Sequence, residues 1–468
     1  MAPTNPAQKI QDPTANDGGF NSMPKKDLDG RKVYIETYGC QMNLADSELM
    51  GGILAEEGFD AADSFEESDV ILINTCAVRE RAEERVFGRL THLLQYKHDN
   101  PDLVLGVTGC MAENLRDKIV DQAPYVDLVV GPDAYRRLPE LVAECMQENA
   151  DPVIDVKLDK EEVYEGFSPK RSSGVGGWVT IQRGCDKFCT FCIVPFTRGR
   201  ERGVPPKDIL RQCRDLAERD YQKVTLLGQT VNSYTYEDTD FADLLEQIVE
   251  VDGLERIRFT SPYPVDFTPK LIDTIARHDE ICNYVHLPMQ SGSNDILERM
   301  RRGYTIEEYV DLVERMREAI PDIAISTDII VGFPGESEED FRKTRDLMEE
   351  LRFDFAYMFK YSEREKTYAQ REMEDDISEE LKKERLTEII EMQEEISREV
   401  CESRIGTVQE VMVEGESKRD DSELSGRTDD FKTTVFPKPD EGVLEPGDLV
   451  DVRIDDCTSH TLLGELSG

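Results

Sequence analysis

Three short apolar runs rich in β-branched residues mark the first third of the chain. They cover residues 33–40, 70–76 and 103–110, and each ends in a cysteine, namely Cys40, Cys76 and Cys110. Amphipathic helical sequence follows the runs, as in 47–57 and 79–95. Apolar runs that alternate with helical patterns at a regular interval predict βαβ units and a parallel sheet.

Strand-like and helix-like patterns also alternate between Trp178 and Glu399. Helical stretches such as 206–219, 241–251 and 305–319 separate the apolar runs, and a long amphipathic helix, 378–403, closes the segment. Six β/α units predict a partial parallel barrel, whose active site lies at the carboxyl ends of its strands. The predicted strands are 178–182, 223–227, 256–260, 284–287, 323–331 and 353–361.

The last part of the chain has short strand-like runs at 408–414, 432–436 and 449–454, separated by Gly, Pro and Asp. This pattern is typical of a small β-barrel. We therefore predict an α/β protein with an N-terminal parallel sheet, a partial (β/α)6 barrel and a C-terminal β-barrel. The predicted parts are a disordered N-terminus (1–30), a first domain (31–147), a charged and then Gly/Ser-rich linker (148–177), the catalytic barrel (178–403) and the small barrel (404–468).

The composition and the local charge pattern disagree about whether the chain can bind a nucleic acid. The 468 residues include 56 Lys and Arg against 99 Asp and Glu, a formal net charge of −43. Such a surplus is an adaptation to a salty cytoplasm or the mark of an ordinary acidic protein, and taken alone it argues against a nucleic-acid partner. Locally, however, basic residues outnumber acidic ones over 181–223, and Arg299, Arg301 and Arg302 form a second basic cluster.

Cellular context follows from what the sequence lacks. No long apolar stretch predicts a transmembrane helix, and no signal peptide is apparent. Eleven cysteines without a secretory signal indicate a reducing, cytoplasmic setting and metal or redox use.

Three cysteines lie close together in the run Gly184–Cys192, at Cys185, Cys189 and Cys192. Thiolates are soft ligands that suit iron–sulfur clusters. A four-iron cluster wants four ligands, so three cysteines would leave one iron open for a substrate. Structural zinc is the alternative, but zinc sites usually combine two close pairs of ligands, and no further Cys or His lies near this run.

The cysteines of the first domain suggest a second site. Each follows a predicted parallel strand, so Cys40, Cys76 and Cys110 should meet at the carboxyl edge of the sheet, where open parallel sheets bind ligands. The alternative is three cysteines buried in the core. The equivalent positions favour a second three-cysteine cluster site.

The spacing of Cys185, Cys189 and Cys192 resembles that of the radical S-adenosylmethionine enzymes. This resemblance implies that the open iron binds S-adenosylmethionine and that its cleavage yields a 5′-deoxyadenosyl radical. Phe191 matches the family's aromatic position beside the adenine, with packing against the barrel as the alternative. Asp328 is a candidate contact of S-adenosylmethionine, with a role in a structural turn as the alternative.

The whole chain resembles the methylthiotransferases, which combine a three-cysteine domain, a radical S-adenosylmethionine barrel and a TRAM-like barrel. The local strings fit the branch that modifies isopentenyladenosine in tRNA better than those that modify threonylcarbamoyladenosine or a ribosomal-protein aspartate. Residues 228–231, 200–205 and 364–369 depart from the family's patterns. The matching strings are 38–43, 74–79, 194–201, 226–229 and 286–293.

The resemblance implies two 4Fe–4S clusters and a double use of S-adenosylmethionine, as methyl donor and as radical source. A methylthio group would be added to C2 of N6-isopentenyladenosine at position 37 in the anticodon loop of tRNA. It further implies an electron donor such as a flavodoxin-type protein, no membrane partner and a monomer. A non-catalytic iron–sulfur electron carrier or RNA-binding module is the hypothesis from another class.

The small barrel contains none of these six cysteines. Its removal is therefore expected to weaken RNA binding and to spare cleavage of S-adenosylmethionine. Arg427 and Lys432 are its candidate RNA contacts.

Overall fold

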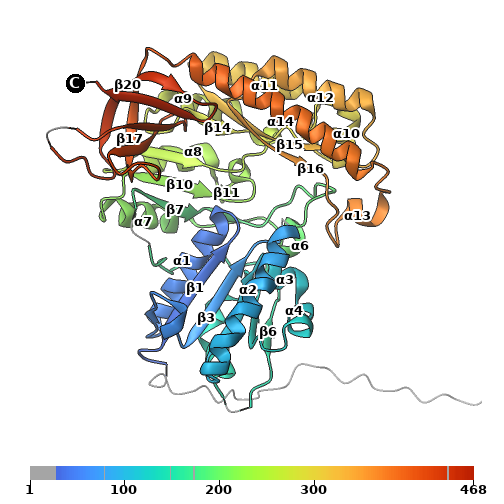
Figure 1. Ribbon diagram of the computed structural model, residues 1–468, viewed down its shortest axis with the longest axis vertical. Helices are drawn as coiled ribbons and strands as arrows, with labels where there is room; N and C mark the ends of the chain where they lie inside the picture. The colour runs from blue at the N-terminus through green and yellow to red at the C-terminus, as the bar shows by residue number, and fades with distance from the viewer. Residues whose placement is uncertain (1–27, 78–79, 148, 172–173, 440–441, 468) are drawn as a thin grey trace, which may run out of the picture.

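The computed structural model describes residues 28–77, 80–147, 149–171, 174–439 and 442–467 (Figure 1). Most of the N-terminus predicted to be disordered lies outside these residues. Residues 28–30 form a turn, and Leu28 is buried in the core of the first domain. Each helix in the described ranges is too short or too polar to cross a lipid bilayer.

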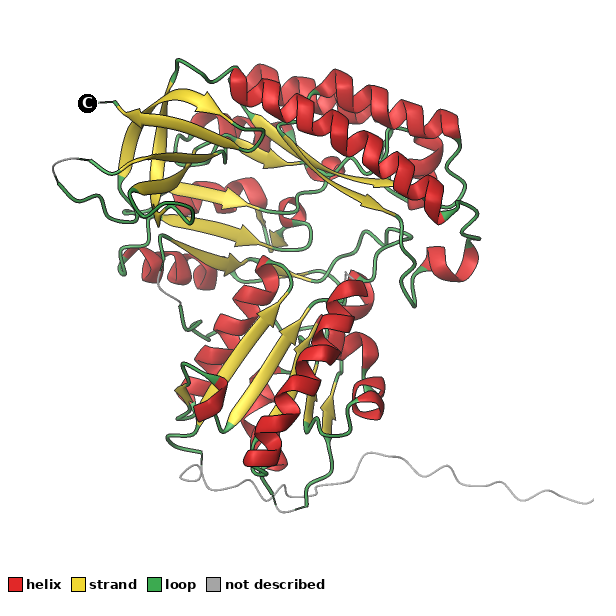
Figure 2. Cartoon of the chain, in the orientation of Figure 1, coloured by secondary structure: helices red, strands yellow, loops and turns green. Residues whose placement is uncertain are grey.

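The first domain is a six-stranded sheet in the order β2-β1-β3-β4-β5-β6, and every neighbouring pair is parallel, as the sequence predicts. Helices cover both faces (Figure 2). Alternate strand residues face opposite sides, so Leu72 packs with α1 and α5 while Ile71 and Ile73 pack with α2 and α3. The elements are β1 (Lys32–Tyr38), α1 (Gln41–Glu56), β2 (Asp60–Ala61), β3 (Val70–Thr75), α2 (Glu80–Asp99), β4 (Val104–Gly109), α3 (Cys110–Leu115), α4 (Asp117–Gln122), β5 (Leu128–Val130), α5 (Leu138–Cys145) and β6 (Val153–Asp155).

The structure differs from the sequence analysis in the linker predicted at 148–177. Strand β6 pairs with β5 and extends the first sheet, and Tyr164 belongs to the core of the first domain. The run Val153–Asp155 is too short to give a strand signal, and it forms a strand because a sheet edge is available for pairing.

The second domain contains the six predicted parallel strands, in two groups of three. The sheets β13-β10-β7 and β14-β15-β16 are joined by one parallel bridge, between Ile257 and Ile281. The strands are β7 (Gly176–Thr180), β10 (Lys223–Leu227), β13 (Arg256–Phe259), β14 (Tyr284–His286), β15 (Ala324–Val331) and β16 (Phe355–Lys360).

Helices surround these strands and end with the long helix α14, which matches the amphipathic helix predicted from sequence. The helices are α6 (Val194–Thr197), α7 (Pro206–Ala217), α8 (Phe241–Val249), α9 (Pro269–Arg277), α10 (Asn294–Met300), α11 (Ile306–Ala319), α12 (Glu338–Leu351), α13 (Tyr368–Glu372) and α14 (Glu379–Glu402). Short strands in the loops are β8 (Gln182–Arg183), β9 (Arg202–Gly203), β11 (Thr235–Tyr236) and β12 (Thr239–Asp240).

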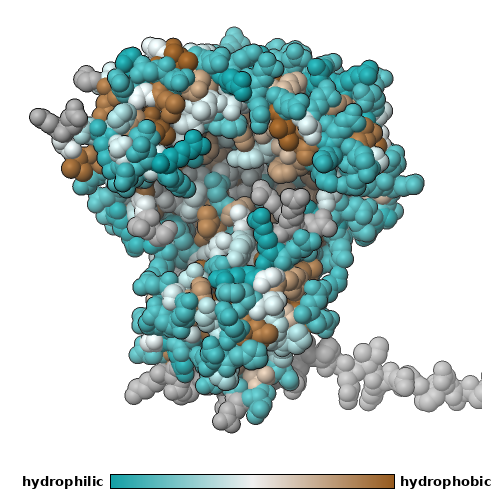
Figure 3. All heavy atoms as spheres, viewed as in Figure 1, coloured by the Kyte–Doolittle hydropathy of each residue, from teal (hydrophilic) through white to brown (hydrophobic). Residues whose placement is uncertain are grey.

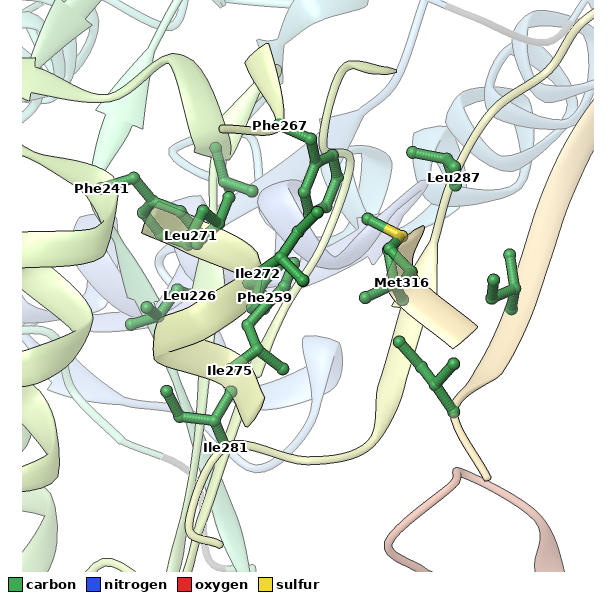
Figure 4. Packing of buried hydrophobic residues seen from close by; sticks show 14 of the residues in the cluster. Leu226, Phe241, Phe259, Phe267, Leu271, Ile272, Ile275, Ile281, Leu287 and Met316 are labelled. Atoms are coloured by element: carbon green, nitrogen blue, oxygen red, sulfur yellow. The ribbon is translucent and has the colours of Figure 1, made fainter. Parts of the chain in front are cut away.

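One hydrophobic core holds the barrel strands against the helices. Figure 4 shows Phe259 of β13 close to Ile272 and Ile275 of α9, with Phe241 of α8 beside Leu271. These helices carry apolar residues at spacings of three and four, which places them on one side of each helix. The packing fixes the strands, and with them the loops at their carboxyl ends.

The C-terminal part is a closed five-stranded barrel, as predicted, in the order β17-β18-β19-β21-β20. It lies beside the catalytic barrel, whereas the first domain lies at the other side of that barrel (Figure 1). Its contacts include hydrogen bonds from Arg256 to the carbonyl groups of Glu410 and Arg427. The strands are β17 (Val408–Glu416), β18 (Glu423–Thr428), β19 (Thr433–Pro437), β20 (Leu449–Cys457) and β21 (Thr461–Leu466).

Candidate active site

Strand register brings Cys40, Cys76 and Cys110 to one edge of the first sheet. Tyr38 pairs with Thr75, and Thr75 pairs with Gly109, so the three strands end level with one another. Cys40 precedes α1, Cys76 directly follows β3, and Cys110 begins α3. The thiol of Cys76 interacts with that of Cys40 and is the main cause that lowers the pKa of Cys40 to about 6.

A glycine and two asparagines pack tightly around these cysteines. A Cβ atom on Gly39 would lie 2.8 Å from the Cβ of Cys76, so a glycine is needed at that position. The Cys40 thiol donates to Oδ1 of Asn43 at 3.3 Å, and the amide of Asn43 donates to Asn74 and to the carbonyl of Thr75. The buried amides hold α1 and β3 in fixed relation at the cysteine edge.

Cys185, Cys189 and Cys192 lie in the loop that follows β7 and β8. Gly184 begins the turn with a φ of 77°, and a Cβ atom there would overlap the backbone of Arg200. The Thr190 N–H donates to the carbonyl of Met300 at 3.1 Å, and the Thr190 carbonyl accepts from Ala369 at 2.8 Å. The loop is therefore fixed by two distant segments of the barrel.

In each cysteine set, one cysteine is in contact with a buried arginine, and the two arginines are different residues. Nε of Arg198 lies 3.1 Å from Sγ of Cys110, and Nη1 of Arg302 lies 3.2 Å from Sγ of Cys189. No carboxylate contacts Arg302 within the described residues; its side chain also donates to the carbonyl of Pro288 and to the hydroxyl of Tyr304, and it lies over the rings of Tyr263 and Tyr304. Buried cations need a negative partner, and a thiolate-bound cluster would provide one.

Asp46 joins the first domain to the catalytic barrel. It is 0% exposed, and its two oxygens accept from Arg183 at 2.9 Å and from Arg198 at 2.8 Å. A second buried pair, Arg202 with Asp133, crosses the same boundary. Because Arg198 also contacts Cys110, this network places the first cysteine set against the barrel.

One cavity of about 1050 Å³ opens between the domains and has one cysteine of each set in its lining. Cys40 comes from the first set and Cys192 from the second, while β16 contributes Tyr357 and Phe359. The two candidate residues outside the cysteine sets, Phe191 and Asp328, line the same cavity.

Phe191 and Asp328 have different surroundings. The ring of Phe191 meets Phe333 edge to face, with the ring centroids 6.3 Å apart, and Phe191 is part of the cavity lining. Asp328 lies within β15, opposite Tyr357, rather than at the strand end that the sequence suggested. Its Oδ1 lies 3.4 Å from Nε2 of His286. Its place in mid-strand and in the cavity lining does not fit a role in a structural turn.

Sequence reasoning missed several cavity residues. His286 fitted a core histidine better, but it lines the cavity and contacts Asp328 and Ser326. Its alternation with Tyr284, which also lines the cavity, was the available signal. Gln290 lines the cavity as well, with a φ of 71° and an Oε1 that has no hydrogen-bond partner among the residues described.

The basic residues singled out from sequence mostly have structural partners. Arg183, Arg198 and Arg202 are buried in the domain boundary, and Lys187 pairs with Asp266. Arg299 donates to the carbonyl of Pro334. Lys432 is buried and pairs with Asp354 at 3.2 Å, so it is not a surface RNA contact.

Positive charge gathers in the cavity instead. Five cationic residues line it against two carboxylates, although the chain as a whole carries a net charge of −43. Figure 3 shows how hydrophilic residues cover most of the outer face seen there. The cations are Lys223, Arg258, Lys360, Arg364 and Arg427, and the carboxylates are Asp328 and Glu414. The net negative charge of the chain therefore does not argue against a nucleic-acid partner, because the cavity lining carries more cations than carboxylates.

The donor chemistry of the cysteine sets fits an iron–sulfur cluster. In the part of the chain that the structure describes, no three His, Cys, Asp or Glu residues are arranged to hold one metal ion. A cluster of several irons spreads its thiolate ligands more widely than a single zinc ion does. Three cysteines per set, with a buried arginine beside one of them, supply the soft donors and the nearby positive charge that such a cluster requires.

Comparison with known families assigns the class. The Radical SAM superfamily matches residues 179–348, an uncharacterised family (UPF0004) matches 32–131, and the TRAM domain matches 402–467. A radical S-adenosylmethionine methyltransferase, TsrM from Kitasatospora setae, has the same fold with a TM-score of 0.55 at 15% identity, over 71% of this chain and 75% of that one. The fold and the site thus define a radical S-adenosylmethionine protein with a TRAM domain.

Curated relatives are similar over nearly the full length. A tRNA-2-methylthio-N(6)-dimethylallyladenosine synthase of Christiangramia forsetii is 47% identical, over 94% of both chains. One from Porphyromonas gingivalis is 46% identical over 96% of this chain and 97% of its own. The chain belongs to this family of tRNA methylthiotransferases.

Proposed function

We propose that the chain transfers a methylthio group to C2 of N6-isopentenyladenosine at position 37 of tRNA, next to the anticodon. The observation that carries the proposal is one cavity lined by cysteines of two separate sets, Cys40 and Cys192. An electron carrier or an RNA-binding module does not need two such sets around a shared chamber. The similarity to named synthases supports the same reaction.

We assign Cys40, Cys76 and Cys110 to one 4Fe–4S cluster and Cys185, Cys189 and Cys192 to the other. When bound, the clusters and S-adenosylmethionine would supply the sulfur, the methyl group and the radical that breaks a carbon–hydrogen bond. Arg198 and Arg302 would balance the negative charge of the thiolates they contact.

The remaining cavity residues would bind and orient S-adenosylmethionine and the modified adenine. Phe191 and Asp328 would contact the S-adenosylmethionine; in support, both line the cavity, and Phe191 is next to Cys192 in the chain. Tyr357 and Phe359 present exposed aromatic rings for base stacking, and Gln290 offers an amide acceptor.

The same proposal assigns a cellular setting. The reaction would run in the cytoplasm, where tRNA is available and thiols stay reduced. An electron donor of the flavodoxin type would supply reducing electrons, and the chain would act as a monomer that binds the anticodon loop.

The decisive experiment uses reconstituted protein, S-adenosylmethionine, a reductant and tRNA that carries N6-isopentenyladenosine. Mass spectrometry of the digested nucleosides should show the 2-methylthio derivative, with 5′-deoxyadenosine as a co-product. Transcripts that carry threonylcarbamoyladenosine serve as the matched control and should stay unmodified. Formation of 5′-deoxyadenosine without any methylthio nucleoside would contradict the assigned substrate.

Iron content should report the two cysteine sets separately. Anaerobic reconstitution should give about eight irons per chain if each set holds a four-iron cluster. Cys110→Ala should keep roughly half of that iron, and Cys213→Ala, which alters a buried cysteine in neither set, should keep all of it. A full iron load in Cys110→Ala, measured by colorimetric iron assay, would exclude the first cluster.

A further inference from the structure

Three cations from two domains gather at the end of the cavity away from the cysteine loop. Lys223 begins β10, whereas the cysteine loop follows the carboxyl ends of the parallel strands. Arg258 comes from β13 and Arg427 from β18, and all three residues line the cavity. The guanidinium groups of Arg258 and Arg427 lie over the same ring, that of Phe431, at 4.8 and 4.3 Å from its centroid.

The guanidinium group of Arg258 has nitrogen donors that remain available to a ligand. Its side chain is almost fully buried, with the residue 5% exposed, and its Nη2 donates to the carbonyl of Thr428 at 2.9 Å. Nε and Nη1 have no hydrogen-bond partner among the described residues. A buried charged donor without a partner is costly, so this arrangement calls for an anion that enters the cavity.

The nearby carboxylate does not balance the cluster. Glu414 lies 2.7 Å from Nζ of Lys223 and 3.4 Å from Nε of Arg427. Burial acts to raise the pKa of Glu414, but Lys223, Arg427 and Arg258 outweigh it and lower that pKa. Three cations therefore face one ionised carboxylate, and the end of the cavity keeps a positive surplus.

The backbone of Phe431 is held in an uncommon conformation. Its φ is 72°, which a bulky residue rarely adopts. Its ring stacks on Tyr284 at 4.8 Å, and the Thr428 side chain accepts the Lys432 N–H across the turn. Backbone strain of this kind persists where the surroundings fix it, often at a binding site. Here the backbone conformation holds the ring of Phe431 beneath the guanidinium groups of Arg258 and Arg427.

We propose that Lys223, Arg258 and Arg427 bind a backbone phosphate of the tRNA whose target base enters the cavity. The proposal rests on the function proposed above. Guanidinium groups suit phosphate because they offer paired donors in a plane. Tyr357 and Phe359 lie along the same cavity and can stack bases between this site and the cysteines. The acidic outer surface would leave this cavity as a favoured place for the RNA backbone.

The test measures binding of an anticodon stem-loop RNA carrying N6-isopentenyladenosine over a series of salt concentrations. Arg258→Gln and Arg427→Gln should each bind roughly tenfold more weakly, with a salt slope smaller by about one, as expected for one lost phosphate contact. The side chain of Arg427 is 32% exposed, so its variant tests the site even if Arg258→Gln unfolds. Arg453→Gln, an exposed change on β20 outside the cavity, is the control and should bind normally.

Calorimetry with adenosine monophosphate and inorganic phosphate separates an RNA phosphate from a free one. Unchanged RNA affinity and salt slope in both glutamine variants, while wild-type protein modifies tRNA, would overturn the proposal and leave the function intact. Loss of free phosphate binding without loss of RNA binding would also overturn it. If wild-type protein binds the RNA through this site but never methylthiolates it, the proposed function fails and the phosphate site stands.

Discussion

Replacing Cys189 with alanine should abolish both formation of 5′-deoxyadenosine and modification of tRNA. Cys189 is one of three cysteines in the loop after β7, and Nη1 of Arg302 contacts its sulfur at 3.2 Å. If Cys189 is a cluster ligand as proposed, its loss would remove one of the thiolates that hold the cluster and would leave Arg302 buried without its negative partner. Quantifying 5′-deoxyadenosine and tRNA nucleosides by mass spectrometry measures both activities in one reaction.

Cys76→Ala is the informative companion variant. Cys76 lies in the first domain, at the end of β3, and should be dispensable for cleavage of S-adenosylmethionine but required for methylthiolation. We therefore expect 5′-deoxyadenosine without the methylthio nucleoside. Equal loss of cleavage in Cys76→Ala and Cys189→Ala would disprove the division of labour between the two cysteine sets.

Asp46→Asn should destabilise the protein by about 3–5 kcal/mol, the usual cost of removing one partner from a buried ion pair. Asp46 is fully buried between Arg183 and Arg198, and the amide cannot neutralise two guanidinium groups. Chemical denaturation followed by circular dichroism measures the change in the free energy of unfolding. The contact of Arg198 with Cys110 should loosen as well, which would lower the iron content of the first cluster.

Asp311→Asn provides the matched control. Asp311 makes an exposed ion pair with Arg315 on α11, and such pairs contribute about 0.5 kcal/mol. A similar small loss for Asp46→Asn would show that the network between the domains does not hold them together.

Much of the fold could be predicted because it depends on local patterns. The six barrel strands and α14 are visible as apolar runs and helical spacing, and each lies within two residues of its predicted bounds. Strand β6 escaped prediction, since Val153–Asp155 carries no signal of its own and pairs because an edge is available. The bridge from Ile257 of β13 to Ile281, which precedes β14, could not be predicted either, because it reflects how the two sheets meet.

The candidate site also has features that could be predicted from sequence and features that could not. Cys40, Cys76 and Cys110 could be grouped from sequence because three strands end in a cysteine, and the register then aligns them. The contacts of Arg198 and Arg302 with cysteine sulfurs join segments far apart in the chain and leave no periodic trace. The assignment of the six cysteines to two iron–sulfur clusters stays a prediction until the iron assays are done.

The cavity is built by all three domains, and this limits how the chain can be divided or recombined. The expectation that removal of the C-terminal barrel would weaken RNA binding and spare cleavage of S-adenosylmethionine treated it as a separate module. Yet Arg427 and Phe431 form part of the chamber wall, and Arg258 donates to the backbone of Thr428. Removal would leave Arg258 without that acceptor. A chimera that exchanges C-terminal barrels between relatives would therefore need matched partners for Arg256, Arg258 and Tyr284, and interdomain pairs of this kind should be inherited together.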